Sequence, residues 1–426
     1  MNEYNYDLTQ QKIYYKQLEN GLKIYLIPNS NQNHYYVNVA CFYGSNDVEF
    51  TPINSQEMIK TPLGVAHFLE HKLFEMEDES NPFDFFGKTG TVVNASTGYY
   101  CTRYYIWGIK NIKENIKYFL DMIYKPNFTE RNISKERGII QEEINMYDDD
   151  PYWNLDHALR NNIFHNLYIK EKIGGTVESI NEINDKTLYQ IYNTFYQPNN
   201  MAIIIGGKFD SNDIMNFLEN ETILKTLPTG KEITRKEITE PETVKEEYKK
   251  IMGNIIIPKL KYAFKINKDR FSIKDPIILN MYLNCIFSSL FGSMGDFGER
   301  AYSEKLTTGY FFNHSYHDNY YVFEIEAESD KADLFKDLVD ETINNINVSE
   351  RDLNLHKKMW ISSEVRLTDY IDLLVDSVIE DIITYNHLYL NRSSIIKKLN
   401  YSELKQVIKE LDLSNNTFVL LLPHDN

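Results

Sequence analysis

One apolar segment near the start of the chain carries three polar side chains that constrain how it can fold. Residues 63–75 read LGVAHFLEHKLFE, and their apolar positions recur every three or four residues, which predicts a helix with one face in a core. His67 and His71 are four residues apart, so on a helix both imidazoles lie on the same face. The carboxylate of Glu70 reaches the same region. Because charged groups are rarely buried unless they are paired or bind a metal, this helix needs a partner that satisfies them.

Zinc is a metal that these residue types can bind. Catalytic zinc sites use three protein ligands, drawn from imidazole nitrogens and carboxylate oxygens, plus a water. His67 and His71 offer two ligands, and the spacing H-x-x-E-H is the inverted zincin pattern, in which Glu70 is the candidate general base. A histidine pair with this spacing also occurs on solvent-facing helices, so the pair by itself leaves a surface position open.

A second predicted helix, residues 133–147, offers the missing ligand. Glu136 and Glu143 are two helical turns apart and lie on one face, whereas Glu142 points about a quarter-turn away. We predict that Glu143 is the third ligand and that Glu136 orients a ligand histidine from behind, a role close to the catalytic centre. With this second helix present, metal binding becomes the favoured interpretation.

The rest of the pattern predicts an α+β fold in two halves. Residues 224–250 are charged, contain two prolines and a glycine, and show little apolar periodicity, which indicates a linker. Strands are expected on both sides of it, at 21–28, 35–43, 90–96, 99–106, 201–206, 253–258, 261–266, 320–326 and 418–422. Helices are expected at 111–124, 155–165, 181–195, 275–291, 332–346, 350–369 and 370–385. We therefore predict two related domains, 1–223 and 251–426, each a mostly antiparallel sheet packed with helices.

Composition excludes several classes of function. The formal net charge of -17 argues against a nucleic-acid surface and suits a basic peptide, although a solvated acidic surface is the simpler explanation. No apolar run approaches the roughly 20 residues of a membrane span. Residues 1–7 lack the basic and apolar regions of a signal peptide, so we expect a cytoplasmic protein. Cys41, Cys101 and Cys285 form no disulfide pattern and are expected to fill core space.

These motifs resemble the insulinase/pitrilysin family of metallopeptidases. Residues 64–75 (GVAHFLEHKLFE) are similar to the active-site helix of that family. Glu136-x6-Glu143 is similar to its second motif, whose final glutamate is a zinc ligand. Residues 90–97 (GTVVNAST) resemble its G-x-x-x-N-A-x-T strand, and residues 147–153 (YDDDPYW) resemble a bacterial branch of short members.

The resemblance implies a zinc-dependent endopeptidase. Two chains would enclose a chamber, either as a homodimer or as a heterodimer with a related, sometimes metal-free chain. A peptide substrate would pair with the strand at Asn94 and Ala95. Glu70 would take a proton from the attacking water and pass it to the leaving amine. Related proteases of this branch accompany peptide-maturation systems, so the resemblance implies either maturation of a ribosomal peptide or clearance of unstructured peptides.

The second half departs from the family pattern. Many active members carry an arginine and a tyrosine seven residues apart around a glycine, and alignment on Gly309 puts Lys305 and Phe312 at these places. Since phenylalanine cannot donate a hydrogen bond, Tyr310 or a partner chain would have to replace the tyrosine. The alternative is a partner-dependent or non-catalytic structural subunit of a peptidase heterodimer. The intact His67 and the other site residues argue against it.

Two other segments have simpler explanations. His314 and His317 lie in the polar stretch 313–319 with no third ligand nearby, which predicts a surface loop. Residues 291–298 (FGSMGDFG) hold three glycines. They suit a mobile substrate-gating loop, but a helix-end connection is the simpler interpretation.

Overall fold

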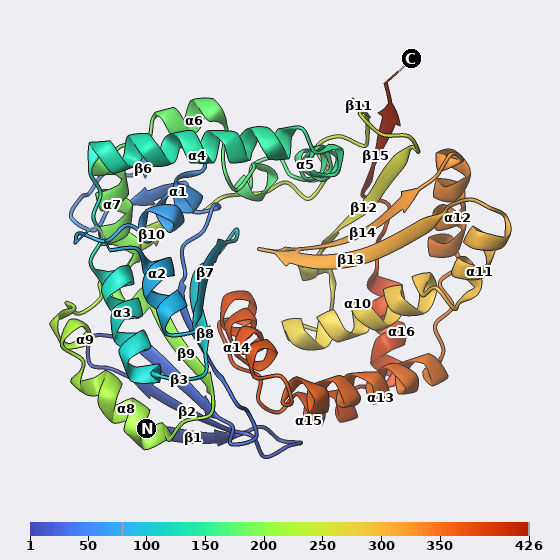
Figure 1. Cartoon of the computed structure of the whole chain (residues 1–426). Helices are drawn as coiled ribbons and strands as arrows, with labels where there is room; N and C mark the ends of the chain where they lie inside the picture. Colours follow the sequence, from blue (N-terminus) through green and yellow to red (C-terminus); the bar gives the residue numbers. More distant parts are fainter. Residues whose placement is uncertain (79, 425–426) are drawn as a thin grey trace. The chain divides into compact units, whose positions relative to one another are not determined.

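The computed structural model describes residues 1–78 and 80–424, which divide into two compact units (Figure 1). Unit 1 comprises Met1–Asn145, Lys172–Glu237 and Ser363–Arg392. Unit 2 comprises Met146–Glu171, Ile238–Ser362 and Ser393–Asn426. Each unit packs helices against its own sheet, so the predicted α+β class is confirmed.

Unit 1 is built on a seven-stranded sheet with the order β1-β2-β3-β9-β4-β8-β7. Strands β3 and β9 are parallel, and the other neighbours are antiparallel. Strand β7 forms one edge of the sheet. The strands are β1 Asn2–Asn5, β2 Lys12–Gln17, β3 Lys23–Pro28, β4 Tyr35–Cys41, β7 Val92–Thr97, β8 Thr102–Gly108 and β9 Met201–Gly207. A small sheet in the same unit pairs β10 (Thr234–Arg235), β5 (Glu49–Thr51) and β6 (Ile59–Lys60).

Helices pack on both faces of the large sheet because its central strands are apolar on both sides. In β4, Val37 and Val39 face a core that includes residues of α1, α3, α7 and α8, whereas Tyr36 and Ala40 face a second core that includes α14. The helices assigned wholly or mainly to unit 1 are α1 Val65–Lys72, α2 Pro82–Lys88, α3 Ile112–Tyr124, α4 Glu130–Asp148, α6 Val177–Asn181, α7 Asp185–Phe195, α8 Ser211–Asn220, α9 Thr222–Thr226 and α14 Ile371–Tyr385.

Unit 2 is built on a five-stranded sheet with the order β11-β15-β12-β14-β13, in which only β11 and β15 are parallel. Its strands are β11 Tyr248–Gly253, β12 Lys259–Asn267, β13 Gly309–His317, β14 Tyr320–Glu328 and β15 Asn416–Pro423. Its helices are α5 Pro151–Ile163, α10 Pro276–Phe291, α11 Asp296–Ser303, α12 Ala332–Asn344, α13 Glu350–Leu367, α15 Arg392–Lys398 and α16 Tyr401–Glu410. The ends of α4, α13 and α15 cross the division between the units.

Neither unit is one continuous stretch of chain, which differs from the predicted domains 1–223 and 251–426. Helix α5 packs on β12 and β15 of unit 2, and α14 packs on β4 and β9 of unit 1. The reason is burial, because the apolar face of α14 completes the second core of unit 1. Gly206 of β9 permits this approach, since a Cβ there would lie 2.5 Å from Ile371. The chain passes from unit 1 to unit 2 between residues 237 and 238, and this point falls inside the predicted linker 224–250.

Two predictions for unit 2, one strand and one loop, are wrong. The strand expected at 253–258 lies earlier, as β11. Its two adjacent lysines and its alternation of exposed and half-buried positions are typical of an edge strand, and in sequence they look like a linker. The surface loop expected at 313–319 is mostly β13, paired with β14 along its whole length. Phe312 and Tyr316 pack against the core there, so His314 and His317 are half-buried strand residues.

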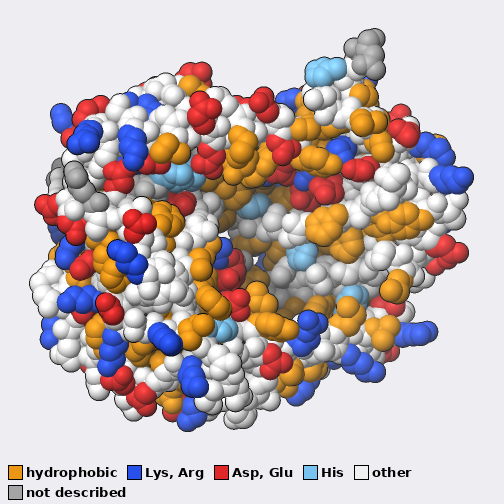
Figure 2. All heavy atoms as spheres, in the orientation of Figure 1, with side chains coloured by type: hydrophobic (Ala, Val, Ile, Leu, Met, Phe, Trp, Pro, Cys, Tyr) orange, Lys and Arg blue, Asp and Glu red, His pale blue; other side chains and the backbone are white. Residues whose placement is uncertain are grey.

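The most apolar helical segment belongs to the core of unit 2. By length and composition alone, residues Pro276–Ser303 are long and apolar enough to cross a membrane. In the structure this segment is two helices, α10 and α11, and α10 buries Leu283, Ile286, Phe287 and other apolar residues. Cys41, Cys101 and Cys285 are free and buried, as expected from the sequence. The face drawn in Figure 2 carries acidic, basic and apolar side chains.

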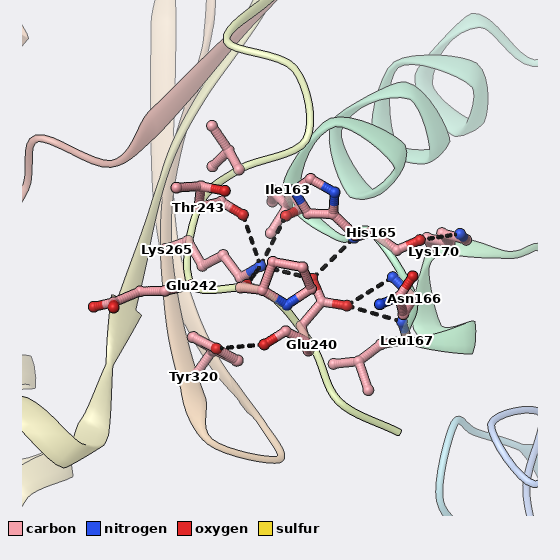
Figure 3. Close-up of polar contacts among 12 residues, drawn as sticks. Ile163, His165, Asn166, Leu167, Lys170, Glu240, Glu242, Thr243, Lys265 and Tyr320 are labelled. Atoms are coloured by element: carbon pink, nitrogen blue, oxygen red, sulfur yellow. Dashed lines mark hydrogen bonds and ion pairs between the residues drawn. The ribbon is translucent and has the colours of Figure 1, made fainter. Parts of the chain in front are cut away.

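A buried ion pair fixes the chain between α5 and β12 (Figure 3). Lys265 of β12 contacts the carboxylate of Glu240 at 2.7 Å, and their side chains are 0% and 3% exposed. The same carboxylate accepts backbone N–H bonds from His165, Asn166 and Leu167. Lys265 also donates to the carbonyl oxygens of Ile163, Pro241 and Thr243. Part of the predicted linker is thereby held rigidly within unit 2.

Replacing Lys265 with methionine should destabilise unit 2. The substitution keeps the length of the side chain but leaves the Glu240 carboxylate buried without its cation, which costs about 3–5 kcal/mol. The measurement is the free energy of unfolding from urea titration. Lys398→Met, at an exposed position of α15, is the control and should change that free energy by less than about 0.5 kcal/mol. Equal effects of the two substitutions would contradict the structural role of the pair.

Candidate metal centre

The two histidines are held by a helix whose other face is anchored in the core. In α1, Phe68 and Leu69 are fully buried in the core of unit 1. The helix starts at Gly64, which has a left-handed backbone with φ of 84°. A Cβ at Gly64 would lie 2.3 Å from the carbonyl oxygen of Gly174, so the close approach of these two segments requires glycine. This packing fixes the direction in which His67 and His71 point.

Helix α4 carries the two glutamates on the side that faces α1. Its buried residues Ile133, Ile140 and Ile144 anchor it in the same core. Glu136 is 8% exposed, and the side chain of Glu143 is 25% exposed. The helical spacing therefore brings both carboxylates to the histidines, as the sequence predicts.

Three ligand atoms converge on one point. The Nε2 atoms of His67 and His71 are 3.2 Å apart. The carboxylate oxygens of Glu143 lie 3.7 Å from Nε2 of His67 and 3.8 Å from Nε2 of His71. Donors around a tetrahedral zinc, at about 2.0–2.2 Å from the ion, are themselves about 3.3 Å apart. The donor types and spacings of this set therefore fit a zinc ion with a fourth position open.

Glu136 fixes the orientation of one ligand. Its carboxylate lies 2.9 Å from Nδ1 of His71, which leaves Nε2 of that ring free to bind a metal. Burial disfavours the charged form of His71, but the hydrogen bond and charge of Glu136 outweigh it and raise the pKa of His71. Burial and the neighbouring His71 lower the pKa of His67 to about 4, so His67 is a neutral ligand at pH 7. The structure thus brings together all the residues predicted for the metal.

Glu70 lies beside the ligands with an environment suited to a base. It is 8% exposed, and burial raises the pKa of its carboxyl group, while hydrogen bonds from Thr97 partly oppose this rise. The hydroxyl of Thr97 donates to the carboxylate. Sequence reasoning assigned no role to Thr97, although it is the last residue of the G-x-x-x-N-A-x-T pattern. A glutamate with a raised pKa is closer to the range in which it can both accept and return a proton.

Asn94 and Ala95 lie on β7, the edge strand that also carries Thr97. The backbone N–H of Ala95 donates to the side-chain oxygen of Asn94 at 2.8 Å. This N–H is therefore bonded to a side chain and points away from the ladder with β8. Edge strands with free backbone groups are able to pair with another strand.

The residues considered for substrate contacts in the second half belong to unit 2 and have other partners. Phe312 packs against Phe291 and Phe323. The hydroxyl of Tyr310 donates to the carbonyl oxygen of Phe291 at 2.9 Å, so it is already used within the unit. Lys305 has a left-handed backbone with φ of 55° just after α11. His314 lies 3.0 Å from the side-chain oxygen of Asn280.

Comparisons with known proteins agree with the site. Residues 58–203 match the family described as Insulinase (Peptidase family M16), and residues 182–359 match its inactive domain. The chain is 35% identical over 306 residues to the uncharacterized zinc protease YmfH of Bacillus subtilis, covering 70% of this chain and 71% of that protein. Its donor set and the names of its relatives both identify zinc as the cofactor.

Solved structures share the fold. A putative M16-like peptidase from Alicyclobacillus acidocaldarius superimposes with a TM-score of 0.89 at 24% identity, covering 96% of this chain and 98% of that chain. The first half of the periplasmic protease PqqL from Escherichia coli gives a TM-score of 0.76 at 18% identity, covering 99% of this chain and 93% of that half. Against the whole of PqqL, this chain covers 48%.

Replacing Glu136 with glutamine should weaken zinc binding without removing a ligand. The amide holds Nδ1 of His71 less strongly than the carboxylate does, and such outer partners typically change metal affinity about 10–100-fold. The measurement is zinc competition with a chromophoric chelator. Glu142→Gln, an exposed neighbour on α4, is the control and should bind zinc as the wild type does. If both variants bind zinc equally well, Glu136 does not orient the ligand.

Proposed function

The chain belongs to the insulinase family of peptidases, family M16, and from this membership we propose that it is a zinc-dependent endopeptidase that cuts unstructured peptides. One observation carries the proposal. Two imidazoles and one carboxylate converge with spacings that suit zinc, and the buried Glu70 lies next to them. A merely structural zinc site is usually closed by four protein ligands, whereas this one has three. The intact set also opposes the alternative of a non-catalytic subunit.

Glu70 moves the proton in this proposal. A zinc ion, when bound, supplies a Lewis acid that activates water and polarises the peptide carbonyl. Glu70 accepts the proton of the attacking water and delivers it to the nitrogen of the leaving amine. Thr97 holds the carboxylate toward this region through its hydroxyl. His67, His71 and Glu143 would hold the ion.

The peptide would lie along β7. Its backbone would pair with the free edge of that strand, replacing the contact between the Ala95 N–H and the Asn94 side chain. Such pairing recognises main-chain groups and therefore tolerates many sequences. Because Thr97 at the end of β7 contacts Glu70, a peptide paired there has a carbonyl within reach of the metal centre.

We also propose that the working enzyme contains two chains. This chain aligns with 93% of the first half of PqqL and with 48% of the whole of PqqL, so about half of PqqL lies outside the alignment. A second copy or a related chain would supply that half and complete a chamber that excludes folded proteins. It would also provide a hydrogen-bond donor to the substrate. Phe312 has no donor, and the hydroxyl of Tyr310 already donates to the carbonyl oxygen of Phe291.

Glu70→Gln should keep zinc and lose cleavage. The amide is similar in shape but cannot accept a proton, and the loss of a general base costs about 10²–10⁴-fold in rate. The measurements are zinc content by mass spectrometry and cleavage of an internally quenched, unstructured peptide. Glu77→Gln, at an exposed position after α1, is the control and should cut normally. A wild type that binds no zinc, or a Glu70→Gln variant that cuts at the normal rate, would contradict the proposal.

Ala95→Pro should weaken substrate binding through the backbone alone. Proline removes the N–H that points to the free edge, while the ladder with β8 keeps its bonds. We expect KM to rise about 3–10-fold, the loss of one hydrogen bond, with zinc content unchanged. Ala95→Ser retains the N–H and is the control. If KM is the same for both variants, the peptide does not pair with this part of β7.

A further inference from the structure

A polar cavity of about 370 Å³ lies in unit 1 on the sheet face that α14 covers. Residues of β4, β7, β8 and α14 line it. Strand β7 contributes Val92 and Ser96, whereas Val93 and Ala95, which alternate with them, face the core that contains α1. Because side chains alternate along a strand, the cavity and the metal centre lie on opposite faces of β7.

The lining of the cavity carries two carboxylates, Asp372 and Asp376, and one cation, Arg103, so negative charge is in excess. Asp372, Asp376 and Glu380 are spaced four apart, so they lie on one face of α14. Arg103 of β8 pairs with Glu380 at 3.2 Å. Within residues 1–78 and 80–424, neither Asp372 nor Asp376 has an ion-pair partner. Burial raises the pKa of Asp376, and the charge of Arg103 opposes this rise.

The side-chain oxygen of a buried asparagine in the cavity also lacks a hydrogen-bond donor as its partner. Asn38 of β4 is 1% exposed. Its nitrogen donates to the hydroxyl of Tyr36 at 3.4 Å, and that hydroxyl lies 3.4 Å from Asp376, so both contacts are long. The side-chain oxygen of Asn38 is buried and accepts no hydrogen bond from any residue that the structure describes. Buried acceptors are normally paired, so this oxygen indicates a missing donor.

The acceptors and the walls together define the chemistry of a ligand. Two carboxylates and an unpaired amide oxygen fit a cation with several N–H donors. The rings of Tyr36 and Tyr105 are 5.8 Å apart, and Trp107 lies on the same wall, so aromatic faces are available to a planar cation. A guanidinium meets these demands better than an ammonium, because its fork binds carboxylates in two places and stacks on rings.

We propose that this cavity is a specificity pocket for an arginine side chain of the peptide substrate. The inference rests on the proposed function, since the peptide must lie along β7. A paired strand lies about 4.8 Å from β7, so its side chains on this face stand beside Val92 and Ser96 at the mouth of the cavity. These residues are one and five positions from Thr97, which contacts Glu70. The arginine is therefore about one to five residues from the bond that is cut.

The test measures binding separately from cleavage. Unstructured fluorescent peptides carry one arginine at successive positions, and matched peptides carry citrulline, which has the same shape without the charge. Their dissociation constants are measured by anisotropy with zinc-loaded Glu70→Gln protein. At one position of the arginine, we expect binding about tenfold tighter than that of the citrulline peptide.

Matched variants assign the effect to the cavity. The double variant Asp372→Asn, Asp376→Asn should reduce the ratio of citrulline to arginine dissociation constants to about one. Asp369→Asn removes a charge from an exposed position just before α14 and should leave the ratio near ten. In the active chain, the ratio of kcat/KM for the two peptides should change in the same way.

The outcomes separate the two proposals. If the wild type cuts both peptides and their dissociation constants are nearly equal, the pocket is overturned and the peptidase remains intact. The wild type could instead show a tenfold ratio of dissociation constants that the double variant loses, while cutting neither peptide. That result would support the pocket and overturn the peptidase. A ratio that survives the double variant would place the selectivity elsewhere and overturn the pocket.

Discussion

Two imidazole nitrogens face each other at 3.2 Å beside a carboxylate, and most of unit 1 is arranged to hold them there. The two nitrogens lie within hydrogen-bonding distance of each other, and the ring tautomers decide which of them donates. Helices α1 and α4 are held in place by core residues on their other faces, such as Phe68 and Ile140. Glu136 then fixes His71 from behind. His67, His71 and Glu143 would hold a zinc ion at this point.

Strand β7 connects this centre to the rest of unit 1. One of its faces carries Ala95 and meets the core beneath α1, and the other carries Ser96 and borders the acidic cavity. Its outer edge has no strand partner among the described residues. In the proposed enzyme, a paired peptide would present alternate side chains to the two faces, so chemistry and selection would occur on opposite sides of one strand.

Burial explains where sequence-based predictions were right and where they were wrong. Apolar periodicity located α1, α4 and the central strands because these segments have one local pattern and one core. It failed at β11 and β13, where edge position and polar residues hide the alternation. It also placed α14 in the wrong half, since the apolar face of a helix does not specify which sheet it covers.

The sequence by itself determined which side chains meet at the candidate zinc site and the α+β class. His67, Glu70 and His71, like Glu136 and Glu143, lie within single helices, where residue spacing fixes which side chains share a face. Only the tertiary structure decided that Thr97 holds Glu70 and that Asp372 and Asp376 face Asn38 across a cavity. These contacts join residues far apart in the chain. Their distances depend on how helices and strands pack together, which local spacing does not encode.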